Sequence, residues 1–96
     1  MQQGSYVLIR DNAAGVFVGV LCSVQLETKC WTLTAARKIH YWQGAAAVEG
    51  IATHGVGEGS RLTPVVSEVA GCDLVQIIAV SDEAVVALKA WPEWTP

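Results

Sequence analysis

The sequence is poor in charged residues and contains no long hydrophobic run. Charged side chains make up 16% of its 96 residues, against about 25% in an average soluble domain. Its longest apolar stretch, residues 15–22, is far shorter than the roughly 18 residues that a membrane-spanning helix needs. The N-terminus lacks a basic segment followed by an apolar one. We therefore expect no membrane partner and no secretion signal.

Catalytic and metal-binding motifs are also missing. The sequence contains no Gly-x-Ser-x-Gly, His-Glu-x-x-His or Cys-x-x-Cys pattern, and neither His40 nor His54 lies in a recognisable catalytic setting. The glycine-rich residues 55–60 lack the Gly-Lys-Ser/Thr ending of a phosphate loop. We expect a protein that is not an enzyme and that has no metal or cofactor.

The cysteines and the net charge narrow the setting further. Cys22, Cys30 and Cys72 are odd in number and lie among apolar residues, which is typical of buried free thiols in a reducing compartment. The sequence thus predicts a cytoplasmic protein. The formal net charge is −3, whereas nucleic-acid-binding domains normally present a basic face. We expect no nucleic-acid partner.

A chain of this length predicts a single domain over residues 1–96. Residues 6–10, 15–26, 29–34 and 37–42 have the composition or alternation of β-strands. The nearly all-apolar residues 74–80 predict a further strand that is covered on both faces. A glycine-rich loop and Pro64 precede it, so we expect regular structure to resume only near Cys72.

Two short helices complete the predicted fold. Apolar residues at helical spacing over 45–52, followed by Gly55, indicate the first helix. Ser81 is a good N-cap for a second helix over residues 82–90. The order β-β-β-β-α-β-α predicts an α+β fold, with an antiparallel, rolled or barrel-like sheet of about five strands and two short helices.

The high apolar content predicts self-association. Hydrophobic residues make up 52% of the sequence. Strands with apolar residues on both faces need two covering layers, whereas two short helices supply little more than one. A second copy of the chain is the simplest way to cover the remaining apolar face, so we expect a homo-oligomer.

Basic and aromatic side chains are densest in residues 37–42. Guanidinium groups bind phosphate and aromatic rings stack on bases, so this segment is a candidate site for a small anionic or nucleotide-like ligand. Strand alternation lets at most half of it face one ligand. Arg10 joins the patch if the first and fourth strands are neighbours. The other interpretation is a strand with an aromatic core face and a solvated basic face. The candidate ligand-binding residues are Arg10, Arg37, Lys38, His40, Tyr41 and Trp42.

The sequence has four tryptophans and only one phenylalanine. Trp31 and Trp42 fit the core. Trp91 and Trp94 flank Pro92 near the C-terminus and are candidate anchors of a subunit interface, because large aromatic residues are favoured there. The alternative is a tail that folds over the sheet of its own chain.

Two segments carry a resemblance to a known family. Residues 14–21 read Ala-Gly-Val-Phe-Val-Gly-Val-Leu, and residues 36–45 read Ala-Arg-Lys-Ile-His-Tyr-Trp-Gln-Gly-Ala. They resemble the Ser-Ala-Gly-Val-x-x-Gly and Ala-Arg-Arg-Ile-x-Tyr-Trp-x-Gly-Ala signatures of an uncharacterised family of small proteins from phages, prophages and other mobile elements. Ala13 stands in place of the family's serine, and Lys38 replaces its second arginine. The resemblance implies an accessory protein without assigned catalysis.

Together these observations predict an oligomeric binding module for a small anionic or nucleotide-like ligand, or for a host protein. The alternative is a purely structural assembly protein, in which the aromatic and apolar residues serve self-association.

Overall fold

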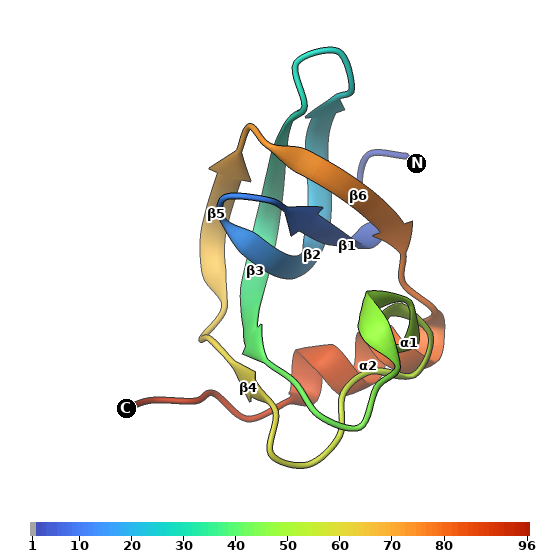
Figure 1. The fold of residues 1–96 in the computed structure, drawn as a ribbon, viewed down its shortest axis with the longest axis vertical. Coiled ribbons are helices and arrows are strands. Elements are labelled where there is room, and N and C mark those ends of the chain that lie inside the picture. Colours follow the sequence, from blue (N-terminus) through green and yellow to red (C-terminus); the bar gives the residue numbers. More distant parts are fainter. Residues whose placement is uncertain (1) are drawn as a thin grey trace.

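The computed structural model describes residues 2–96, which form one antiparallel sheet and two short helices (Figure 1). The predicted α+β class is confirmed, and the sheet is not closed into a barrel. The elements are β1 Tyr6–Asp11, β2 Gly15–Gln25, β3 Cys30–Tyr41, α1 Ala47–His54, β4 Arg61–Leu62, β5 Val66–Gly71, β6 Leu74–Ala79 and α2 Asp82–Ala90.

The longest strand, β3, organises the sheet. The strand order β6, β1, β2, β3 fills one side of it, and its other edge is shared by β5 and β4. β5 pairs with the first half of β3, from Trp31 to Ala36, and β4 pairs with its last residues. Figure 1 shows β4 beside the end of β3, close to both helices. The end of β3 thus meets elements from the second half of the chain.

The prediction of two separate strands over residues 29–34 and 37–42 was wrong. They form the single 12-residue strand β3. Its backbone enters the left-handed region at Ala35 (φ 47°), where the pairing with β2 also shifts register. The irregular stretch expected before Cys72 was also wrong in part, because β4 ends before Pro64 and β5 begins after it. A proline between two short strands does not interrupt either ladder.

Alternation along β1 divides the core into two clusters on opposite faces of the sheet. Leu8 packs with both helices, whereas its neighbours Val7 and Ile9 pack with Phe17 and Trp31. The second cluster contains no helical residue and is covered by the sheet itself, since residues from β1, β2, β3 and β6 meet there. The chain therefore covers much of its own apolar surface. The homo-oligomer stays a prediction.

The strand β6 differs from its expectation. It was predicted to be covered on both faces, but it lies at an edge of the sheet, pairs with β1, and leaves Val75 54% exposed. An all-apolar run of this length does not by itself distinguish a central strand from an edge strand.

The second helix begins and ends as predicted, and the first ends at the predicted Gly55 but begins at Ala47, two residues after the expected start. Ser81 caps α2 by accepting a hydrogen bond from the Ala84 N–H at 3.1 Å, and its hydroxyl donates to the carbonyl of Thr53 in α1 at 2.6 Å. Gly55 ends α1 with a positive φ of 87°, and its N–H donates to the Ile51 carbonyl. No helix among residues 2–96 is long and apolar enough to cross a bilayer.

The prediction of three free thiols was wrong for two of them. Cys30 and Cys72 form a disulfide, and Cys22 is free and half-buried. The register explains the pairing, because Trp31 pairs with Gly71 in the antiparallel β3–β5 ladder. The residue before Trp31 therefore lies opposite the residue after Gly71. This pairing depends on contacts between distant strands, which cysteine spacing alone does not reveal.

Candidate functional site

The predicted basic and aromatic residues of β3 have different surroundings. Arg37 is only 2% exposed. Its Nε donates to the Thr63 carbonyl at 2.8 Å, and its Nη1 donates to the carbonyls of Leu88 and Trp91 at 2.8 and 2.7 Å. A weaker bond runs from Nη2 to the Pro92 carbonyl at 3.4 Å. Arg37 therefore binds the end of α2 and the C-terminal tail to the segment that follows β4.

Three other candidates also lie apart from one another. The Lys38 ammonium lies over the ring of Phe17, 5.8 Å from its centroid. Trp42 is half-buried and packs against the cluster that contains both helices. Arg10 is exposed on β1, and β2 separates that strand from β3. The condition under which Arg10 would join the patch is therefore not met.

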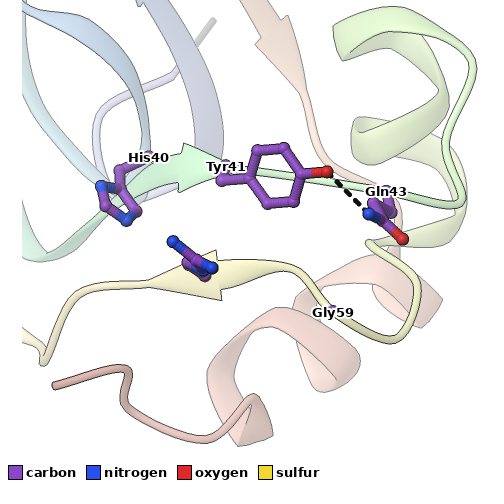
Figure 2. A pocket seen from close by; sticks show the side chains of 5 residues that line it. His40, Tyr41, Gln43 and Gly59 are labelled. Atoms are coloured by element: carbon purple, nitrogen blue, oxygen red, sulfur yellow. Dashed lines mark hydrogen bonds between the residues drawn. The ribbon is translucent and has the colours of Figure 1, made fainter. Parts of the chain in front are cut away.

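His40 and Tyr41, in contrast, line one open pocket of about 520 Å³. Gln43, Gly59 and Arg61 complete its lining, and Figure 2 shows His40, Tyr41 and Gln43 side by side along the end of β3. Successive strand residues normally face opposite sides. Here the pairing of β3 with β4 shifts register between Ile39 and Tyr41. We call this site, together with the adjacent Trp94, the Arg61 pocket.

Arg61 provides the positive charge of the pocket. Its guanidinium carbon lies 5.0 Å from the ring centroid of Trp94 and 5.6 Å from that of Tyr41. Within residues 2–96 the guanidinium makes no hydrogen bond or ion pair. Aromatic faces hold a guanidinium through its flat surface, which leaves the N–H groups at its edge available. The charge is thus positioned by the fold without being neutralised.

The C-terminal tail brings Trp94 to this pocket. The Trp94 N–H donates to the Leu62 carbonyl of β4 at 3.0 Å, and its ring lies 4.8 Å from that of His40. Nearer to α2, the Trp91 indole donates to the Ser60 carbonyl at 3.1 Å. The tail therefore folds along the sheet of its own chain. A role of Trp91 and Trp94 in a subunit interface stays a prediction.

Gln43, which lines the pocket, forms hydrogen bonds with Tyr41 and Ser60. Its side-chain amide donates to the Tyr41 hydroxyl at 2.6 Å, the contact drawn in Figure 2. Because the Tyr41 oxygen accepts this bond, its own proton is available to a ligand. The Gln43 N–H donates to the Ser60 hydroxyl at 2.9 Å. Gly59 has a φ of 94°, and a Cβ there would lie 3.2 Å from the Gln43 amide oxygen, so glycine suits this turn.

Sequence reasoning missed Arg61, Gln43 and Gly59. The only local signal was the position of Arg61 directly after the glycine-rich loop, and β4 is too short to be recognised from periodicity. His54 lies elsewhere, at the surface, where its Nδ1 is 3.3 Å from the Glu83 carboxylate. No cluster of three metal-binding side chains occurs within residues 2–96.

Comparison with known proteins places the chain in a family. No curated protein and no solved structure matches it. The family match runs from the turn before β1 to Leu88 in α2, so it includes all five lining residues of the pocket and excludes Trp94. The chain belongs to the family described as a domain of unknown function (DUF6948), which matches residues 4–88.

Proposed function

We propose that this protein is a non-enzymatic binding module for a small anionic ligand, which binds in the Arg61 pocket. The observation that carries the proposal is the Arg61 guanidinium, which is held against two aromatic rings while its hydrogen-bond donors stay free. The Tyr41 hydroxyl offers a further donor beside it. A concave pocket of about 520 Å³ suits a small molecule better than a protein surface. We therefore favour a small ligand over a host protein.

Binding rather than catalysis follows from the chemistry of the lining. The pocket presents His40, Tyr41, Gln43 and Arg61, and its lining includes no serine, cysteine, aspartate or glutamate. Hydrolytic sites normally combine a histidine with one of these side chains as nucleophile, acid or base. Hydrogen-bond donors around a fixed cation suit the retention of an anion instead.

Calorimetric titration with inorganic phosphate, ribose 5-phosphate, acetate and benzoate tests this function. We expect at least one of these anions to bind, and Arg61→Gln to weaken that binding by about tenfold or more. Lys38→Gln is the matched control, because it removes the same charge from a residue outside the pocket. Both variants should keep the melting temperature of the wild type. The proposal fails if no anion binds at millimolar concentration, or if Lys38→Gln weakens binding equally.

The origin and the location of the protein are also proposals. The two sequence signatures support an origin in phages or other mobile elements, and the gene neighbourhood tests it.

We further propose a cytoplasmic location, although the disulfide removes the argument from three free thiols. Maleimide labelling of Cys30 and Cys72 in fresh lysate tests the location. A labelled, reduced pair supports the cytoplasm, and a protected pair contradicts it.

We also propose that the chain forms a homo-oligomer. Within residues 2–96, β5 pairs with β3 alone and β6 with β1 alone, so each strand leaves one backbone edge unpaired. The exposed side chains of Val66 and Val75 lie on these two strands. Unpaired edges with apolar residues favour association between sheets. Light scattering across micromolar concentrations tests the proposal, and a monomer throughout overturns it.

A further inference from the structure

We propose that the ligand of the Arg61 pocket is a nucleoside monophosphate. The inference rests on the proposed function and deepens it. Three features of the pocket carry it: the number of separate donors, the aromatic rings, and the limited positive charge.

Three residues of the lining, Arg61, Tyr41 and His40, carry hydrogen-bond donors. Arg61 offers the edge of its guanidinium, Tyr41 offers its hydroxyl proton because Gln43 donates to its oxygen, and His40 lines the same pocket with its ring. A planar carboxylate has two oxygens and is satisfied by the arginine alone in a bidentate pair. A phosphate monoester has three terminal oxygens in a tetrahedral arrangement. Donors on three residues therefore suit a phosphate better than a carboxylate.

Aromatic rings lie in and beside the pocket, since Tyr41 lines it and Trp94 lies next to Arg61. Tyr41 is 44% exposed and Trp94 is 37% exposed, although both are large aromatic side chains. Trp94 is also held in place, by its backbone bond to Leu62 and by the ring of His40. A pocket of about 520 Å³ is far larger than a phosphate group needs. Arg61 already lies over both rings and His40 packs with Trp94, so a base would stack on the ring surface that these residues leave exposed.

The charge of the pocket limits the size of the anion. Arg61 is the one lysine or arginine that lines it. Glu58 precedes Gly59 in the sequence, Glu93 precedes Trp94, and the whole chain has a formal net charge of −3. Binding of a nucleic-acid strand normally depends on several lysine or arginine contacts to successive phosphates. One cation in an acidic chain therefore suits a single phosphate rather than a polynucleotide.

Calorimetric titrations with four matched compounds test the inference. AMP carries both a base and a phosphate, adenosine lacks the phosphate, ribose 5-phosphate lacks the base, and a short adenosine oligonucleotide repeats the unit. We expect AMP to bind about tenfold more tightly than adenosine and than ribose 5-phosphate, because stacking and the phosphate contact both contribute. The oligonucleotide should bind no more tightly than AMP.

Two variants separate the contributions. Arg61→Gln should lower the affinity for AMP to that for adenosine. Trp94→Leu should lower the affinity for AMP by a larger factor than the affinity for ribose 5-phosphate, because it removes a ring for the base as well as one of the two rings that position Arg61. A merely structural role of Trp94 would weaken both compounds equally, and that result would overturn the stacking role.

The outcomes also distinguish this inference from the proposed function. If ribose 5-phosphate binds as tightly as AMP, or if benzoate binds and AMP does not, the nucleotide is excluded while the anion site stands. Tighter binding of the oligonucleotide would replace the mononucleotide by a nucleic-acid strand. If no anion binds at all, the proposed function itself fails.

Discussion

The two ends of β3 treat a charged side chain in opposite ways. At the Cys30 end, the Asp11 carboxylate is 3% exposed and accepts hydrogen bonds from the Trp31 indole at 2.7 Å and from three backbone N–H groups at 2.8–3.0 Å. At the Tyr41 end, Arg61 is exposed, and its guanidinium makes no such bond within residues 2–96. A charged group whose hydrogen bonds are all made within the fold holds distant segments together, whereas a charged group without such bonds is available to a ligand.

The Tyr41 end of β3 also depends on a charged group whose hydrogen bonds are made within the fold, that of Arg37. Two of its four bonds to backbone carbonyls go to Trp91 and Pro92 in the C-terminal tail, and the tail carries Trp94 to the pocket. Burial lowers the pKa of Arg37, yet an arginine stays protonated in proteins. The pocket is therefore built from one cation that the fold uses fully and one that it leaves free.

The largest expected effect is that of Arg37→Met. The variant leaves buried carbonyls without a donor, so we expect the free energy of unfolding to fall by roughly 3–5 kcal/mol. Each kcal/mol corresponds to about 4–8 °C in melting temperature for a chain of this size. Urea unfolding and calorimetry measure the loss. Lys38→Met is the control, because its ammonium lies over a ring near the surface. Equal losses in the two variants would show that Arg37 is not the anchor of the tail.

The second largest effect concerns Asp11, at the Cys30 end of β3. Burial alone would raise the pKa of Asp11, but the bonds from Trp31 and from three backbone N–H groups outweigh it and hold the pKa below its usual value. Ionised Asp11 thus stabilises the fold above about pH 4, and this contribution is lost as the pH falls through the lowered pKa. Asp11→Asn replaces one accepting oxygen by an NH2 group that would face the N–H donors around it. We therefore expect the free energy of unfolding to fall by roughly 2–4 kcal/mol at neutral pH.

Unfolding curves between neutral and strongly acidic pH check this expectation. The wild type should lose stability below about pH 4 more steeply than Asp11→Asn does. The matched control is Asp73→Asn, because Asp73 contributes its backbone N–H to the network rather than its carboxylate. If Asp73→Asn flattens the acid limb as much as Asp11→Asn, the contrast between the two ends of β3 is lost.

The parts of the fold that were predictable rest on local signals. Ser81 and Gly55 mark helix ends through their own hydrogen bonds and backbone angles, so both helices could be predicted from the sequence. The continuity of β3 could not be predicted, because the alternation of the strand is interrupted around Ala35, where the backbone is left-handed. The pairing of Cys30 with Cys72 needs the register of β3 against β5, which local patterns do not contain.

The same division applies to the candidate site. His40 and Tyr41 were found because basic and aromatic residues are dense in one segment. Arg61 and Trp94 were not assigned to the site, since they come from distant parts of the chain and are brought together by backbone bonds. Arg37 stood out in the same segment for its charge, but its burial follows from the carbonyls of α2 and the tail.

The smallest expected effects are those of substitutions at Trp91 and Trp94. Within the tail, these two residues repeat the contrast between a side chain that is hydrogen-bonded within the fold and one that is not. Trp91→Phe removes the indole bond to the Ser60 carbonyl and part of a half-buried ring, so we expect a loss of about 1–2 kcal/mol. Trp94→Phe keeps a ring beside His40 at an exposed position, and the change should stay within about 0.5 kcal/mol. Urea unfolding measures both. A larger loss from Trp94→Phe would mean that Trp94 serves to anchor the tail, and the Tyr41 end of β3 would then be a second structural network rather than a binding site.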